Sequence, residues 1–266
     1  MWEALALTVL AGLATSIGGA IGAHGRVHRG GVLALALAFA AGFMITVSLV
    51  EILPAGYREL SGQLGTGGAA GALGASAAVG VGLVLLLDRI LPPAANPAML
   101  TADPDAADDA HAARQVRLLR SGVLVAVVVA AHNLPEGLAT FVTALQDPKV
   151  GVTLAVAIGI HNIPEGIAVA APIRAATGSW SKAFWWATGS GVAEPVGAVI
   201  GYVLLAAILP QELITLTLGL VSGMMIAISV RELIPAARHH AGRLLEPIIG
   251  LVVGAFVMIT SLLLMR

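Results

Sequence analysis

Two short motifs with the same residue order carry side chains that are well suited to binding a metal ion. The first is His132-Asn-Leu-Pro-Glu136-Gly, and the second, His161-Asn-Ile-Pro-Glu165-Gly, follows 29 positions later. Residues four apart lie on one face of a helix, so each motif places an imidazole one turn from a carboxylate. Neutral imidazole together with carboxylate suits Zn²⁺, and also Fe²⁺, Mn²⁺, Co²⁺ or Ni²⁺. If the two faces oppose each other, they form one site with four or more ligands.

A third acidic residue belongs to the same pattern. Glu194 lies next to Pro195 in another apolar run, and Glu136 likewise lies next to Pro135. A proline inside a helix removes one backbone hydrogen bond, and the freed carbonyl needs another partner, such as a cation or its water. Three carboxylates in a medium of low dielectric constant repel one another or take up protons. The sequence therefore leaves two alternatives, a site for two metal ions or a site that exchanges protons for metal.

Composition identifies the environment of these residues as a membrane. The chain of 266 residues is 58% hydrophobic and 11% charged, with a mean hydropathy of +0.94. Soluble domains are about 45–50% apolar and about 25% charged. A net charge of −1 offers no basic surface for nucleic acid, and the absence of cysteine excludes thiolate ligands. These numbers exclude a soluble enzyme, a disordered protein and a nucleic-acid-binding protein.

Apolar runs of about 20 residues predict membrane-spanning helices. We expect an all-α integral membrane protein with eight such helices, near 3–22, 31–56, 69–91, 118–145, 150–173, 183–209, 212–237 and 246–265. We expect them to form a single transmembrane domain over residues 1–266. The acidic, proline-containing segment at about 92–117, which includes His111, is expected to be a flexible cytoplasmic loop.

The distribution of lysine and arginine predicts the orientation of the chain. With the N-terminus outside, eleven of the 14 basic residues fall on the inner side. Basic residues accumulate on the cytoplasmic side of membrane proteins. We therefore expect both termini outside the cytoplasm, in a cell membrane, which in a Gram-negative bacterium is the inner membrane.

Internal repeats predict how the spans are related. Residues 42–55 and 223–236 share glycine, methionine, isoleucine, serine, glutamate, proline and alanine in register. The spans that contain them run in opposite directions, as do the spans that carry the two histidine motifs. Inverted repeats with a substrate site between them are typical of transporters. The expected arrangement is three spans, a central pair, and three more.

Taken together, the eight spans, the paired His-Asn-x-Pro-Glu-Gly motifs and Glu194-Pro195 resemble the ZIP (Zrt/Irt-like) family of metal transporters, in its bacterial zinc-uptake branch. The resemblance implies a secondary transporter that carries Zn²⁺, and also Fe²⁺, Mn²⁺, Co²⁺ or Cd²⁺, toward the cytoplasm. It implies a first metal on His132, Glu136, His161 and Glu165, with Met44 close by. A second metal would bind Asn133, Asn162 and Glu194, with Glu136 and Glu165 bridging.

Several alternatives remain open at this point. Glu51, near the outer end of its span, is a candidate for guiding the ion inward. The same site chemistry also serves a selective metal channel or a metal exporter. An intramembrane metalloprotease is excluded because the chain has no His-Glu-x-x-His helix. The glycines of span 69–91 pack either within one copy of the chain or against a second copy in a homodimer. The lipid bilayer surrounds the protein.

Overall fold

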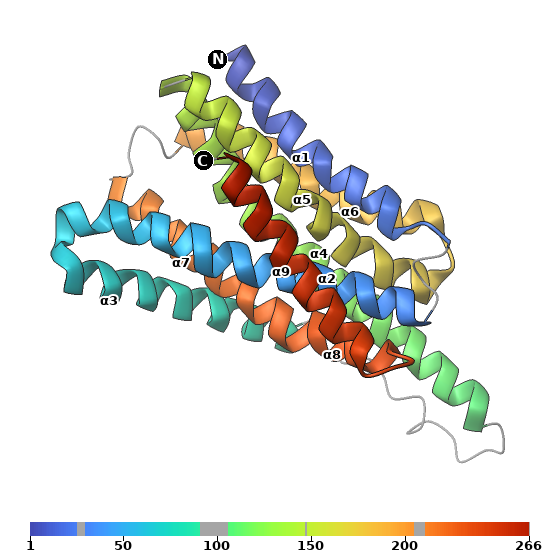
Figure 1. Cartoon of the computed structure of the whole chain (residues 1–266). Coiled ribbons are helices and arrows are strands. Elements are labelled where there is room, and N and C mark those ends of the chain that lie inside the picture. Colours follow the sequence, from blue (N-terminus) through green and yellow to red (C-terminus); the bar gives the residue numbers. More distant parts are fainter. Residues whose placement is uncertain (26–29, 91–105, 147, 205–210, 266) are drawn as a thin grey trace.

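Every regular element formed by the described residues of the computed structural model is helical (Figure 1). The structure describes residues 1–25, 30–90, 106–146, 148–204 and 211–265. In chain order the elements are α1 (Trp2–Gly22), α2 (Gly30–Val47), η1 (Ser48–Ile52), α3 (Leu53–Ile90), α4 (Ala106–Gln146), α5 (Pro148–Thr177), α6 (Trp180–Leu204), α7 (Gln211–Ile228), η3 (Ser229–Leu233), α8 (Ile234–His240) and α9 (Leu245–Met265).

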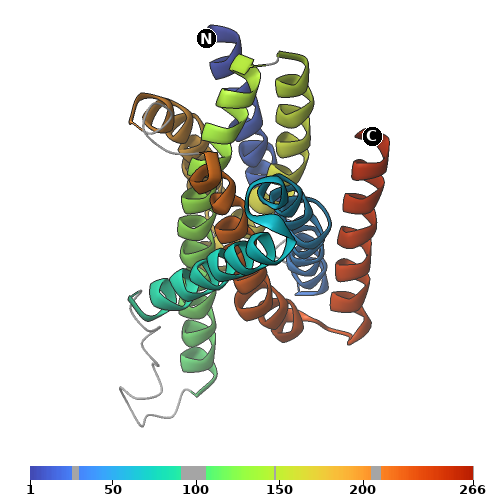
Figure 2. The ribbon, with the colours of Figure 1, turned by 90° about the vertical axis from the view of Figure 1, so that its left-hand side faces the viewer.

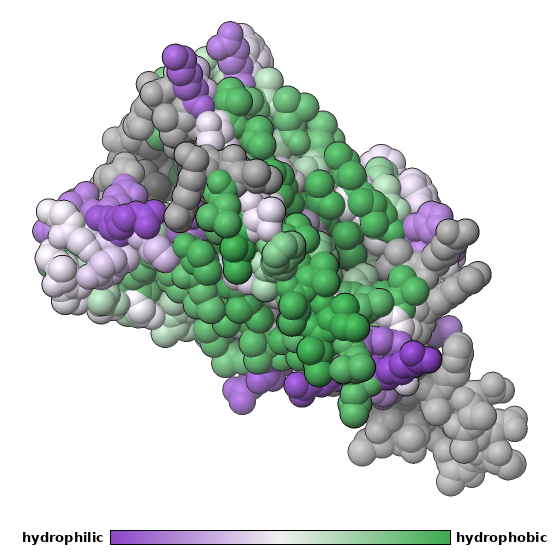
Figure 3. Space-filling model, in the orientation of Figure 1, coloured by the Kyte–Doolittle hydropathy of each residue, from purple (hydrophilic) through white to green (hydrophobic). Residues whose placement is uncertain are grey.

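Six stretches of the described residues are long and apolar enough to cross a membrane. One of them, Gly31–Ile90, spans 60 residues and includes parts or all of α2, η1 and α3, which follow one another directly along the chain. The chain turns back within α3 at Gly65, whose φ of 70° is left-handed and favours glycine. Hydrophobic side chains cover the middle of the molecular face in Figure 3, and hydrophilic side chains lie at its edges.

The boundary of α4 differs from the sequence-based expectation. The segment 92–117 was expected to be loop, but residues 106–117 continue the helix that carries the first histidine motif. Alanine and arginine are strong helix formers and are frequent there, which explains the extension. Residues 91–105 lie outside the described part of the chain, and so does the side chain of His111.

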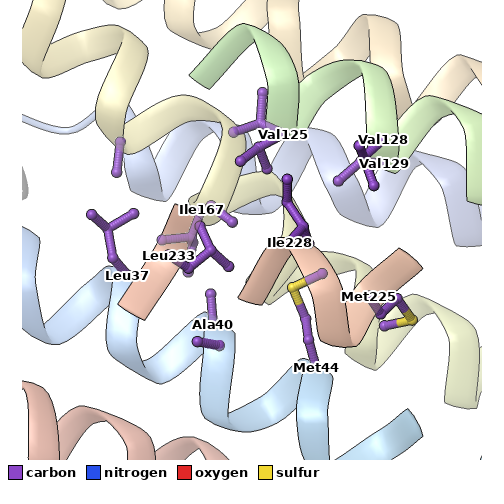
Figure 4. Close-up of a cluster of buried hydrophobic side chains, with 14 of the residues drawn as sticks. Leu37, Ala40, Met44, Val125, Val128, Val129, Ile167, Met225, Ile228 and Leu233 are labelled. Carbon is purple, nitrogen blue, oxygen red and sulfur yellow. The ribbon is translucent and has the colours of Figure 1, made fainter. Parts of the chain in front are cut away.

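The helices fall into two groups. In the first, α1 packs on α5 and α6, while α4 packs on α5 and α6. In the second, α2 packs on α9 and α3 packs on α7. In the turned view α9 lies at the opposite edge of the molecule from α4 (Figure 2). A buried apolar core joins the groups where α2, α4, α5 and α7 meet, with Met44, Val129, Ile167 and Ile228 among its members (Figure 4).

The second group contains the same packing twice. The backbone at Gly42 of α2 lies so close to Leu251 of α9 that a Cβ would collide with it. Gly223, which is 181 positions after Gly42, lies equally close to Ala77 of α3. The two segments of the repeat therefore share a close helix–helix contact as well as their residue order. Structurally duplicated units are expected to do so.

The same offset relates two π-helical turns. In η1 the N–H of Leu53 bonds to the carbonyl of Ser48, and in η3 the N–H of Ile234 bonds to that of Ser229. A proline follows each turn, and its missing N–H disrupts the regular α-helical bonding. Single π-turns inside α-helices are frequent at functional sites. Each turn contains an acidic residue of the repeated segment.

Candidate metal centre

The two histidine motifs lie opposite each other on α4 and α5 and form crosswise pairs. His132 Nε2 of α4 is 3.1 Å from Glu165 Oε1 of α5. His161 Nε2 of α5 is 3.4 Å from Glu136 Oε2 of α4. Each pair joins the histidine of one motif to the glutamate of the other. The two helical faces therefore oppose each other at these four side chains.

The predicted ligands on α4, α5 and α6 are all buried within the first helix group. Burying a polar or charged side chain is costly unless it has a partner, so such a concentration in an apolar interior needs a compensating interaction. In helices that cross a membrane, ionisable residues face the bundle interior and mark substrate pathways. The buried set comprises His132, Asn133, Glu136, His161, Asn162, Glu165 and Glu194.

The two asparagines of the motifs are fixed by equivalent hydrogen bonds. Asn133 Nδ2 donates to the carbonyl of Ser190 on α6, at 3.0 Å. Asn162 Nδ2 donates to the carbonyl of Ala11 on α1, at 2.9 Å, and to Glu194 Oε2, at 3.0 Å. Because a carbonyl can only accept, the amide nitrogens must face these partners. The amide oxygens therefore point elsewhere and are available as acceptors.

Several polar atoms of this cluster have no hydrogen-bond partner among the described residues. Leaving a buried polar atom unpaired costs about 1–3 kcal/mol, so a group of them indicates a missing donor or cation. His132 Nε2 and Glu165 Oε1 face each other at 3.1 Å, but their contact does not have the geometry of a hydrogen bond. The unpaired atoms are Nδ1 and Nε2 of His132, Oδ1 of Asn133 and Asn162, both carboxylate oxygens of Glu165, and Oε1 of Glu194.

The glycines that end the motifs bring the neighbouring helices close. A Cβ at Gly137 would collide with the backbone of Glu194, so α4 touches α6 at the predicted ligand. A Cβ at Gly166 would collide with the carbonyl of Thr15, so α5 touches α1 in the same manner. Small residues permit this close approach of membrane helices. The motif thus supplies both the candidate ligands and the packing that holds them.

The histidine and glutamate side chains of the cluster form two separate pairs and do not converge on one point. Within the described residues, no group of three or more histidine, aspartate or glutamate side chains is arranged so that it could hold a metal ion. The crosswise pairing accounts for this, because each imidazole faces one carboxylate. A metal substrate bound here would have to come between the members of the pairs.

Two further predicted residues lie outside these pairs. Met44 is fully buried in the apolar core, where Figure 4 shows it near Ile228. Glu51 is half-buried in η1, within the π-helical turn. A hydrogen bond from Ser48 Oγ to the Met44 carbonyl, 2.8 Å long, ties the start of that turn to α2.

A contribution of α1 to the site was not predicted from the sequence. The carbonyl of Ala11 orients Asn162, as the carbonyl of Ser190 on α6 orients Asn133. A signal for this equivalence was present in the sequence. Glycines recur at the same spacing in both helices, 179 positions apart: Gly12, Gly18 and Gly22 in α1 and Gly191, Gly197 and Gly201 in α6.

Comparison with known proteins identifies the family. Residues 94–262 match the family model described as ZIP Zinc transporter. A protein of Corynebacterium efficiens named zinc transporter ZupT is 46% identical over 265 residues, which cover 98% of this chain and 96% of the relative. The chain belongs to the ZIP family. ZIP proteins are transporters rather than enzymes, so the chain is a multi-pass membrane transporter.

Other ZIP relatives agree over nearly the whole length. The zinc transporter ZupT of Corynebacterium glutamicum is 45% identical, with 99% of each chain covered. That of Clostridium perfringens is 38% identical, with 98% of this chain and 95% of the relative covered. The resemblance inferred from the two motifs is therefore confirmed.

Proposed function

We propose that this ZIP protein carries Zn²⁺ toward the cytoplasm through the site between α4 and α5. The observation that carries the proposal is the pair of crosswise contacts, 3.1 Å and 3.4 Å long, between buried imidazoles and carboxylates. The unpaired nitrogen and oxygen atoms of His132 and Glu165 are of the ligand types that Zn²⁺ prefers. Relatives named zinc transporters support zinc as the substrate.

In this proposal the first metal binds His132, Glu136, His161 and Glu165. The free amide oxygens of Asn133 and Asn162 and the free oxygen of Glu194 support a second position, bridged by the two glutamates. Fe²⁺, Mn²⁺, Co²⁺ and Cd²⁺ are secondary substrates, because nitrogen and oxygen ligands discriminate among divalent ions mainly through geometry.

The proposed topology has eight crossings in the 3+2+3 order. The two arms of residues 31–90 on either side of Gly65 count as two crossings, and α6 adds another. In this topology both termini lie outside the cytoplasm, and the helices cross the cell membrane, which in a Gram-negative bacterium is the inner membrane. In both views the N-terminus and the end of α9 lie toward the same side of the molecule (Figures 1 and 2), which supports this topology.

The proposed mechanism is alternating access by a secondary carrier. Glu51 guides the ion into the site from the outer side, and Met44 lies beside the first metal. The first helix group then moves against the second and opens the site to the inside, as in other transporters with inverted repeats. A carrier of this kind gives saturable flux, whereas a channel gives flux that rises nearly in proportion to concentration.

The test is zinc entry into proteoliposomes that contain a zinc-sensitive dye. Glu136→Gln and Glu165→Gln keep the shape of the side chain and remove its charge. We expect saturable entry in the wild type and at least a tenfold loss in both variants. Glu3→Gln, which removes an exposed carboxylate on α1, is the matched control and should keep the wild-type rate. Wild-type rates in both site variants would contradict the proposal.

The proposed orientation has a separate test. The chain contains no cysteine, so a single introduced thiol reports its own accessibility. We expect Arg266→Cys to react with a membrane-impermeant maleimide in intact cells. Arg243→Cys should react only after the cells are opened. The reverse pattern would overturn the topology while leaving the metal site intact.

A further inference from the structure

A groove opens on the outside of the first helix group, between α4 and α6. Its cavity volume is about 550 Å³, within the range of about 300–1,000 Å³ that is usual for small-ligand sites. Ala126 and Ala130 of α4 line one side, and Trp185, Trp186 and Gly189 of α6 line the other. The groove is separate from the metal centre, which lies between α4 and α5.

The groove exists because its lining residues are small where the two helices diverge. Gly189 has open space at the position of a Cβ, in contrast to Gly197 further along α6, where a Cβ would collide with Leu134. The same helix pair is therefore tightly packed near the metal centre and open near the start of α6. Because alanine and glycine carry no polar side-chain atoms, the walls of the groove are apolar at these positions.

Aromatic residues are concentrated at the start of α6. Three of the chain's four tryptophans lie there, although aromatic residues make up only 4% of the sequence. Trp180 stacks on Phe184 with ring centroids 4.7 Å apart, and Phe184 meets Trp185 edge-on at 5.3 Å. Trp185 is nevertheless 63% exposed. Tryptophans exposed in this way are typical of the boundary between lipid acyl chains and headgroups.

One cationic side chain lies at the polar end of the groove. Lys182 is exposed, lines the groove together with Ser181, and precedes the tryptophans by one turn. A lysine at the membrane boundary attracts anionic lipid headgroups. Below it, the apolar walls extend toward the middle of α4 and α6. A cation above an apolar groove is complementary to a molecule with an anionic head and a hydrocarbon tail.

We propose that this groove binds an anionic phospholipid from the surrounding bilayer. The phosphate group lies at Lys182, and an acyl chain lies along Ala126, Ala130 and Gly189, between α4 and the two tryptophans. The groove also includes Ser190, whose carbonyl holds Asn133. The bound lipid thus lies directly behind the backbone that orients a candidate metal ligand. Lipid binding itself does not depend on the proposed transport of zinc.

The test uses the fluorescence of Trp185 and Trp186. The purified full chain carrying Trp2→Phe and Trp180→Phe is placed in phosphatidylcholine nanodiscs, and brominated lipid, which quenches nearby tryptophan, is added in steps. We expect brominated phosphatidylglycerol to reach half-maximal quenching at about a fivefold lower fraction than brominated phosphatidylcholine, the effect of one lysine near an anionic headgroup. Equal quenching by the two lipids would overturn the proposal.

Two variants with matched controls locate the effect. Lys182→Gln should abolish the preference for phosphatidylglycerol, whereas Arg243→Gln, at another exposed basic residue, should preserve it. Gly189→Leu should fill the groove and reduce quenching, whereas Gly74→Leu, at a helical position that also has open space, should not. Ala130→Leu replaces Gly189→Leu if that variant does not fold. A preference for phosphatidylglycerol that survives Lys182→Gln would overturn the proposal. Tryptophans that neither lipid quenches, because a second copy of the chain covers the groove, would overturn it as well.

Discussion

His132 on α4 lies 3.1 Å from Glu165 on α5, and the repeat places His161 and Glu136 in the equivalent contact. Each motif is thus completed by the other rather than by its own glutamate. In the proposed site neither half is complete by itself, which accounts for the two copies of the motif. The proposed metal binding therefore depends on the packing of α4 on α5.

The first prediction concerns metal affinity. If the four side chains form one zinc site, as we propose, Glu165→Gln and His132→Gln should each weaken zinc binding by at least about 100-fold. This is more than the roughly 10–100-fold loss that follows removal of a supporting residue. Competition with a chromophoric chelator measures the affinity. In a double-mutant cycle the two losses should not add, because both variants break the same pair. Fully additive losses would separate the two residues into different sites.

The second prediction concerns the close contact of α4 and α6. Gly137→Ala places a methyl group where the backbone of Glu194 lies, so α4 must move away. We expect a loss of about 1–3 kcal/mol in the free energy of unfolding, seen as a lower midpoint of thermal unfolding in detergent.

The matched control for this variant is Gly189→Ala. The same change there meets open space, and alanine is the better helix former by about 1 kcal/mol. This control should be as stable as the wild type or more stable. A Gly137→Ala protein with wild-type stability would show that α4 and α6 are not in close contact.

The third prediction concerns the asparagines. Asn162→Ala leaves both the Ala11 carbonyl and a Glu194 oxygen without their amide donor, whereas Asn133→Ala affects only the Ser190 carbonyl. We expect Asn162→Ala to be the more destabilising, with a difference of about 1–2 kcal/mol. Chemical unfolding of the metal-free protein measures this difference. Equal losses would contradict the contact between Asn162 and Glu194.

The fourth prediction concerns an ion-pair network that connects the two helix groups. Asp88 of α3 accepts hydrogen bonds from Arg120 of α4, at 2.7 Å, and from Arg231 of η3, at 3.3 Å. Since the Asp88–Arg120 pair is only one-fifth to one-quarter exposed, a double-mutant cycle with Asp88→Asn and Arg120→Gln should give a coupling of about 1 kcal/mol, the upper end for exposed pairs. No coupling would mean that the pair does not stabilise the contact between α3 and α4.

The candidate ligands could be predicted from the sequence because their spacing determines which side chains share a helix face. An imidazole and a carboxylate four residues apart share a helix face. The two motifs differ only at Leu134 and Ile163, so they present the same side chains from two adjacent helices. The repeat near Glu51 and Glu232 likewise reappears in the equivalent π-turns. These relationships are local, so residue order alone is sufficient to state them.

Other features depend on tertiary contacts that local order does not encode. The crosswise pairing of His132 with Glu165 could not be distinguished from pairing within one motif. The role of α1 depends on a main-chain carbonyl, that of Ala11, and every residue has one. The start of α4 at Ala106 was missed because polar residues obscured a helix that continues from an apolar span.

The most direct test of the central claim is anomalous diffraction at the zinc edge from crystals of the zinc-loaded protein. The account predicts a zinc peak between α4 and α5, within ligand distance of His132, Glu136, His161 and Glu165. A second peak, if present, should lie beside Glu194. Zinc peaks only at other places, with the His132–Glu165 and His161–Glu136 contacts unchanged, would contradict the account and leave the paired motifs as a packing device.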